Sequence, residues 1–121
     1  MGIEGIGVDI VEIERFKKII EKYGEKFIKR VFHEKEISSS HSINTLAGKF
    51  AGKEAIMKML GTGWRGIKWR EIKILKSSHG KPYVELEGNA KKICEDLGIK
   101  RIQVSISHVR TLACAFVIGE T

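Results

Sequence analysis

The sequence has few of the residues that stabilise small secreted domains or anchor proteins in membranes. It has two cysteines, Cys94 and Cys114, and neither lies in a Cys-x-x-Cys or His-Cys pattern, so neither a disulfide framework nor a zinc site is expected. Glu4 and Asp9 interrupt the apolar N-terminal stretch, which argues against a signal peptide. No run approaches the roughly 20 apolar residues that cross a bilayer. These absences predict a soluble protein of the reducing cytoplasm.

The chain is short and basic. With 121 residues, 42% of them hydrophobic, it has enough apolar material for one core and too little length for a second. We therefore expect a single domain spanning residues 1–121. The formal net charge of +7 indicates an anionic partner, which the charge alone leaves open as a nucleic acid, a phosphate-rich ligand or an acidic protein.

Hydrophobic periodicity and turn residues predict an α+β fold, in which a mostly antiparallel sheet packs on a long central helix. Strand patterns occupy residues 3–10, 71–76, 83–87, 102–107 and 112–118, and helical patterns occupy 12–23, 43–60 and 89–97. The turn between the second and third strands contains Gly80 and Pro82, which favours a hairpin there. We expect the first strand to end at Asp9, an acid within an apolar stretch.

The long helix has an unusual distribution of side chains. One face is small and uncharged, with Asn44, Gly48, Ala51, Gly52 and Ala55, and the other is a bulky arc of Ile43, Leu46, Phe50, Met57 and Leu60. The charged residues Lys49, Lys53, Glu54 and Lys58 lie in or beside the bulky arc. We expect the small face to pack against another backbone and the arc to line a partly enclosed site. An ordinary ion pair between Glu54 and Lys58, spaced i, i+4, is the alternative.

Three blocks of sequence resemble the bacterial holo-(acyl carrier protein) synthases of the 4'-phosphopantetheinyl transferase superfamily. The first is Gly5-Ile6-Gly7-Val8-Asp9-Ile10-Val11-Glu12-Ile13, the second runs from Lys49 through Lys58 to Gly63, and the third is Val104-Ser105-Ile106-Ser107-His108. Their order, their spacing and the chain length all fit the family. Lys49 stands where arginine is usual, which keeps the charge but loses a bidentate phosphate contact.

The resemblance implies an enzyme that transfers 4'-phosphopantetheine from coenzyme A to a serine of apo acyl carrier protein in fatty acid biosynthesis. Attack on a pyrophosphate needs charge neutralisation more than covalent help, and Mg²⁺ suits this role. Asp9 and Glu54 match the family's metal ligands, and Glu54, Lys58 and His108 its catalytic residues. Whether Glu54 accepts the serine proton directly or through water stays open.

The same resemblance implies binding residues for both substrates. Coenzyme A is expected at Lys49, Lys53, Lys58, Gly61, Gly63 and His108. The acidic carrier protein is expected on the first helix, at Arg15, Lys18, Ile19 and Lys22, where a basic stripe flanks one apolar side chain. Family members of this length are trimers with active sites at subunit interfaces, so we expect a homotrimer.

A small basic nucleic-acid-binding domain is the alternative to an enzyme. The net charge and a basic loop containing Trp64 and Trp69 favour it. Against it, no aromatic pair alternates with basic residues on a strand, as a base-stacking surface requires. A nucleic-acid-binding domain would also leave Asp9 and Glu54 without a role. We therefore expect no nucleic acid as a partner, and no membrane.

Overall fold

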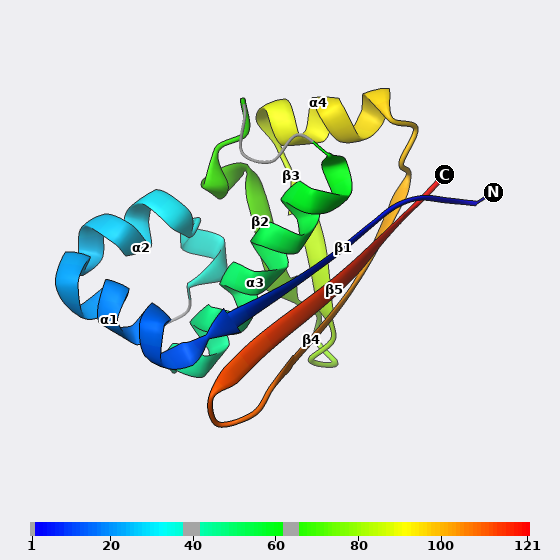
Figure 1. The fold of residues 1–121 in the computed structure, drawn as a ribbon. Coiled ribbons are helices and arrows are strands. Elements are labelled where there is room, and N and C mark those ends of the chain that lie inside the picture. Colours follow the sequence, from blue (N-terminus) through cyan, green and yellow to red (C-terminus); the bar gives the residue numbers. More distant parts are fainter. Residues whose placement is uncertain (1, 38–41, 62–65) are drawn as a thin grey trace.

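The computed structural model describes residues 2–37, 42–61 and 66–121. The long helix α3 (Ile43–Leu60) packs on a three-stranded sheet formed by β1 (Ile3–Glu12), β5 (Leu112–Glu120) and β4 (Arg101–His108) (Figure 1). The strands are ordered β1-β5-β4, and both pairings are antiparallel. The predicted α+β class is confirmed, and α3 has its predicted bounds.

A separate hairpin of β2 (Ile72–Lys76) and β3 (Pro82–Leu86) also packs on α3 and lies beside β4. The hairpin was predicted, but the described strands form two antiparallel sheets where one was expected. The helix α4 (Gly88–Asp96) follows the hairpin and leads into β4.

Two helices precede α3 at one end of the molecule. The first, α1 (Ile13–Tyr23), buries Ile13 and Phe16, and Gly24 ends it with a positive φ of 57°. The second, α2 (Glu25–Val31), and the short helices η1 (Glu34–Glu36) and η2 (Trp69–Glu71) complete the described elements. We did not predict α2, because seven residues give too few turns for a periodic pattern.

The core lies between α3 and the sheet, and the small face of α3 explains how closely they approach. Ala47, Ala51 and Ala55 have no exposed surface and belong to the core. The side chain of Ile106 on β4 packs over Gly48 and Gly52, where a Cβ on Gly48 would lie 2.8 Å from it. The expected packing of the small face against another backbone is found at Ala55, which the backbone of β1 approaches at Gly7, whereas side chains of β2 and β4 cover Gly48 and Gly52. No helix among the described residues is both long enough and apolar enough to cross a bilayer.

The bulky arc of α3 does not line a site along its length, as we expected. Met57 and Leu60 are buried in the core, and the ring of Phe50 stacks on Trp69 with centroids 5.1 Å apart. Only Ile43 and Leu46, near the start of the helix, border a cavity. Core packing at Met57 and Leu60 and aromatic packing at Phe50 therefore occupy most of the bulky arc.

Candidate active site

Two acids that are far apart in the sequence meet between β1 and α3. Asp9 on β1 lies close enough to Glu54 on α3 to raise the pKa of Glu54, and Lys58 lies one helical turn beyond Glu54. The ammonium of Lys58 donates to Asp9 Oδ1 at 3.0 Å and to the carbonyl oxygen of Val8 at 3.1 Å. We call Asp9, Glu54 and Lys58 the acid–lysine cluster. Its ion pair joins Lys58 to Asp9, not to Glu54 as a simple i, i+4 pair would.

The backbones of β1 and α3 touch beside this cluster, because glycines face the helix. A Cβ on Gly7 would collide with the carbonyl oxygen of Ala55, and one on Gly5 would lie 2.8 Å from the carbonyl oxygen of Met59. Asp9 follows Gly7 on the same face of β1, since side chains alternate along a strand. It lies within β1, paired with Ala115, and not at the end of the strand as expected.

Burial and the neighbouring charge of Asp9 change the protonation of Glu54. The pKa of Glu54 is raised to about 7, first by burial, then by the charge of Asp9 and the hydrogen bond to it, whereas Lys58 lowers it. Two neighbouring carboxylates repel when both are ionised, so a proton or a cation stabilises the pair. The cluster can therefore exchange a proton for a cation near neutral pH.

The donor set fits a magnesium ion that is shared with a phosphate ligand. Mg²⁺ in such sites is bound by one or two carboxylates, and phosphate oxygens and water complete the octahedron. Residues 2–37, 42–61 and 66–121 contain no group of three or more His, Cys, Asp or Glu placed to enclose a metal. Asp9 and Glu54 alone would hold the ion loosely, so a bound diphosphate would complete the site.

Apart from the acid–lysine cluster, a cavity of about 270 Å³ lies between the start of α3, the β2–β3 hairpin and the end of β4. Three basic or titratable side chains line it, Lys49, Lys76 and His108. Burial lowers the pKa of Lys49, and its Nζ donates to the carbonyl oxygen of Glu36 at 2.5 Å. We call this cavity the hairpin hollow, and its charge suits a phosphate.

Sequence reasoning named Lys49 and His108 but missed the rest of the hairpin hollow, which is lined by Asn44, Thr45, Gly48, Ile74, Leu75, Lys76, Gly80, Pro82 and Ile106. Lys76 lies at the end of β2, and the chain turns after it through Gly80. No local pattern distinguishes this lysine from an ordinary strand-end charge. Only the pairing of the hairpin beside α3 shows its position.

The acid–lysine cluster and the hairpin hollow lie at different places in one protomer. Asp9 is on β1 and His108 is on β4, and β5 separates these two strands. On α3, Lys49 and Glu54 are five residues apart, which places them on nearly opposite sides of a helix. The structure therefore does not bring all of the predicted site residues together within one chain.

Lys53 was predicted to bind the cofactor, and the structure does not support this assignment. Its side chain has no exposed surface, and its Nζ lies 2.6 Å from Glu36 Oε1. It also donates to the carbonyl oxygens of Trp69, at 3.1 Å, and Ile72. All three donors of the ammonium are thus used inside the core, and none is available to a ligand.

The remaining predicted residues lie on the surface or at element ends. Gly61 ends α3 in the left-handed conformation, with φ of 78°, and its N–H donates to the carbonyl oxygens of Met57 and Lys58. Gly63 and Trp64 lie outside the described residues. The residues expected to contact a carrier protein are all exposed along α1, namely Arg15, Lys18, Ile19 and Lys22.

Trp69, on which the nucleic-acid alternative partly rests, is half-buried. Its ring stacks on Phe50, which also contacts the rings of Phe16 and Phe27. The stacking with Phe50 ties Trp69 to the core, so it serves packing in the described structure.

Comparison with known proteins identifies the family of this chain. The family model described as "4'-phosphopantetheinyl transferase superfamily" matches residues 5–117. A holo-[acyl-carrier-protein] synthase of Halothermothrix orenii is 45% identical over 98% of both chains. The crystal structure of a holo-[acyl-carrier-protein] synthase from Neisseria meningitidis superposes with a TM-score of 0.91 at 35% identity. The match covers 99% of this chain and 100% of the other. The crystal structure of the Helicobacter pylori holo-[acyl-carrier-protein] synthase in complex with coenzyme A superposes with a TM-score of 0.80 at 32% identity. The match covers 95% of this chain and 99% of the other. The chain belongs to the 4'-phosphopantetheinyl transferase superfamily.

Proposed function

We propose that this protein is a magnesium-dependent holo-(acyl carrier protein) synthase, which transfers 4'-phosphopantetheine from coenzyme A to a serine of apo acyl carrier protein. The observation that carries the proposal is the convergence of Asp9, Glu54 and Lys58 in a chain of this superfamily. Relatives over nearly the full length are named for this activity, and one solved relative is in complex with coenzyme A.

The reaction makes one bond and breaks one. The serine Oγ attacks the β-phosphorus of coenzyme A, and the bond from that phosphorus to the bridging oxygen breaks. Adenosine 3',5'-bisphosphate leaves with the electron pair. When bound, Mg²⁺ neutralises the diphosphate and aligns it for attack.

Each residue of the acid–lysine cluster has a role that its surroundings support. Asp9 and Glu54 hold the metal through their carboxylates. Glu54 would also accept the serine proton, directly or through water, because a bound cation keeps its carboxylate ionised. Lys58 is more than half exposed, so its ammonium can turn from Asp9 toward the diphosphate and stabilise the leaving group.

The hairpin hollow holds the nucleotide part of coenzyme A. Lys49 and Lys76 supply positive charge for its phosphates, and His108 lies beside them at the end of β4. Because this hollow and the acid–lysine cluster lie apart in one protomer, one coenzyme A molecule would reach both only if neighbouring protomers contribute one each.

An exposed apolar face of the sheet supports such an assembly. Ile6 and Ile10 on β1 are 61% and 63% exposed, and Phe116 on β5 is 43% exposed. Ile6 pairs with Ile118 and Val8 with Phe116, so these side chains form one continuous surface. A surface of this kind is typical of a subunit interface. We infer a homotrimer in which this face is covered and each active site is shared.

The carrier protein docks on the exposed face of α1. Arg15, Lys18 and Lys22 point away from the buried Phe16, and Ile19 offers one apolar contact among them. A complementary acidic helix would be oriented mainly by charge, which raises the association rate more than it tightens binding.

The test is incubation with apo acyl carrier protein, coenzyme A and Mg²⁺, followed by mass spectrometry. We expect a mass gain equal to one phosphopantetheine group, which a chelator abolishes and added Mg²⁺ restores. Asp9→Asn and Glu54→Gln should each lose the gain while their circular dichroism spectra stay unchanged. Full transfer by either variant would exclude the proposed metal site, and no transfer by the native chain would exclude the function.

A further inference from the structure

A buried acid lies outside the acid–lysine cluster and has no part in the proposed reaction. Glu36, the last residue of η1, is 2% exposed, whereas the other two residues of η1 are exposed. Its carboxylate accepts hydrogen bonds from the ammonium of Lys53 and from the backbone N–H groups of His33 and Ile74, all within 3.0 Å. We call these three bonds the Glu36 network. A buried carboxylate is stable only when it is bonded in this way, so the network ties η1 to α3 and β2.

The backbone of the same residue reaches a lysine of the hairpin hollow. The carbonyl oxygen of Glu36 accepts a hydrogen bond from the Nζ of Lys49 at 2.5 Å. An ammonium has three donors, so the other two can face a phosphate in the hollow that Lys49 lines. Burial lowers the pKa of Lys49, and the negative charge of Glu36 acts in the opposite direction. Glu36 therefore orients this ammonium and favours its charged form.

The network also holds the wall of the hollow that β2 forms. Ile74 and Lys76 lie on the same face of β2, because side chains alternate along a strand, and both line the hollow. Within its sheet β2 pairs only with β3, and the Glu36 carboxylate takes the place of a second strand as the partner of the Ile74 N–H. One buried acid thus sets the positions of Lys49 and Lys76 relative to each other.

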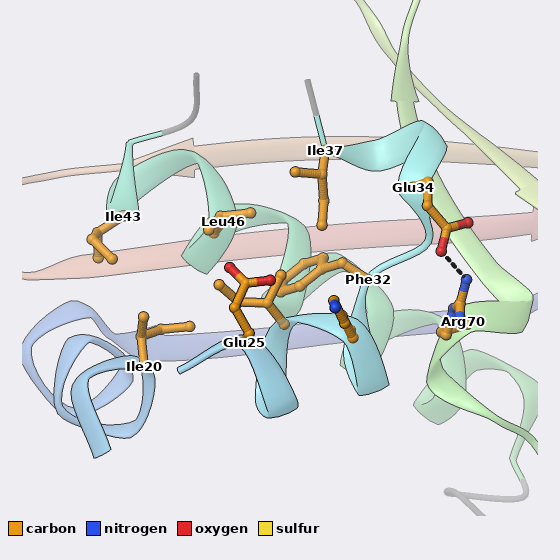
Figure 2. A pocket seen from close by; sticks show the side chains of 10 residues that line it. Ile20, Glu25, Phe32, Glu34, Ile37, Ile43, Leu46 and Arg70 are labelled. Atoms are coloured by element: carbon orange, nitrogen blue, oxygen red, sulfur yellow. Dashed lines mark hydrogen bonds and ion pairs between the residues drawn. The ribbon is translucent and has the colours of Figure 1, made fainter. Parts of the chain in front are cut away.

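Apolar packing gives η1 less support on another side. A cavity of about 570 Å³ adjoins it, between α1, α2 and the start of α3, and Phe32 and Ile37 line this cavity from either end of η1 (Figure 2). Figure 2 also shows the ion pair of Glu34 with Arg70, but both side chains are exposed, and exposed pairs contribute little. Among the described contacts, the Glu36 network is therefore the strongest polar restraint on η1.

We propose that Glu36 is a positioning residue for nucleotide binding, which holds Lys49 and β2 so that the hairpin hollow fits the phosphates of coenzyme A. The inference rests on the proposed function, which takes the hollow as the nucleotide site. Glu36 is buried and does not line the hollow, so it acts on the ligand through Lys49 and not by contact.

A contribution to core stability alone is the other role that a buried ion pair can have. The two roles differ in their dependence on Lys49. If the network only stabilises the core, its loss weakens nucleotide binding by the same factor whether or not Lys49 is present. If the network positions Lys49, the two effects are not additive, and a double-mutant cycle measures the difference.

The test measures the Kd for adenosine 3',5'-bisphosphate by isothermal titration calorimetry, so it does not depend on the transfer reaction. Glu36→Gln together with Lys53→Met removes the network without leaving a buried charge unpaired. We expect this double variant to raise the Kd about tenfold, and to raise it less than about twofold in a chain that already carries Lys49→Met. Glu36→Asp keeps the charge on a shorter side chain and perturbs the fold less. It should show the same dependence on Lys49.

Ile99→Ala is the control for lost stability. Ile99 is buried and precedes β4, at the opposite end of that strand from His108. Truncating it should lower the urea midpoint by creating a cavity, but the Kd for the nucleotide should stay unchanged. Circular dichroism would check the fold of every variant.

The outcomes separate the inference from the proposed function. Equal losses of affinity with and without Lys49 would overturn the positioning role, and so would an unchanged Kd in both Glu36 variants. An equal loss of affinity in Ile99→Ala would attribute the effect to stability and would also overturn it. A native chain that binds the nucleotide but transfers nothing would contradict the proposed reaction alone, whereas one that does not bind it would contradict both.

Discussion

The ammonium of Lys53 lies 2.6 Å from the carboxylate of Glu36, and neither side chain has exposed surface. The same carboxylate accepts hydrogen bonds from the backbone N–H groups of His33, at 2.9 Å, and Ile74, at 3.0 Å. This buried pair joins η1 and β2 to α3. It also fixes the residue next to Glu54, so the core network supports the helix turn that carries the candidate metal ligand.

Lys53→Met should destabilise the fold strongly. Removing one member of a buried ion pair typically costs about 3–5 kcal/mol, because the other charge stays buried without a partner. Urea denaturation at equal protein concentration would measure the change. The double variant Lys53→Met with Glu36→Gln should recover part of the loss, since no uncompensated charge remains. A loss below about 1 kcal/mol, the size of an exposed pair, would contradict this account.

Gly7→Ala should disrupt the contact between β1 and α3. The new methyl group would collide with the carbonyl oxygen of Ala55, and neither backbone can move without displacing core residues. Overpacking of this kind costs about 1–3 kcal/mol or more, and transfer activity should fall with it. Gly2→Ala is the control, because nothing lies within 4 Å of a Cβ at Gly2. Equal melting temperatures for the two variants would show that β1 and α3 have room between them.

Relative to Glu54→Gln, the metal-free protein should become less stable as the pH rises from about 4.5 to about 7. The pKa of Glu54 is raised from 4.5 to about 7, so the native state binds more protons than the unfolded state over this interval, and stability decreases with pH. Mg²⁺ should therefore raise the melting temperature more at pH 8 than at pH 6. Glu54→Gln should lack both this loss of stability with pH and the larger effect of Mg²⁺ at pH 8. If the native chain and the variant behaved alike, both effects would belong to another group.

Arg15→Glu should weaken the carrier-protein interaction and leave coenzyme A binding unchanged. Arg15 is exposed on α1 and pairs only with Glu12, at 3.4 Å, within the described residues. We expect the KM for apo carrier protein to rise about five- to tenfold and to depend less on salt. Lys91→Glu on α4 is the control. An effect confined to the KM for coenzyme A would remove α1 from the docking surface.

Ile6→Glu should separate the protomers. The side chain is 61% exposed in one chain, so the substitution costs the isolated fold little, whereas a charge inside an apolar interface opposes assembly. Sedimentation should show a smaller species, and activity should fall because the proposed site is shared between two chains. Leu97→Glu, also at an exposed apolar residue, should change neither. A native chain that sediments as a monomer would exclude the shared site.

The elements could be predicted from the sequence where a pattern extends over several turns or strand residues. The long helix and the hairpin were found in this way, and α2 was missed because it is short. The meeting of Asp9 and Glu54 followed only from family resemblance, since their separation in sequence carries no geometric information. Lys53 shows the limit of transferring site residues by family resemblance. Its partner Glu36 is 17 residues away, so no local pattern distinguishes a core ion pair from a ligand-binding lysine.

The backbone contact at Gly7 would also limit which ions the proposed metal site can hold. Helix and strand touch beside Asp9 and Glu54, so the gap between the two carboxylates cannot widen easily to suit a larger ion. Ca²⁺ prefers six to eight oxygen ligands at about 2.3–2.6 Å, whereas Mg²⁺ is satisfied by a compact octahedron at about 2.0–2.1 Å. In the proposed metal site, selectivity for small divalent cations would thus be set by two glycines that do not contact the ion.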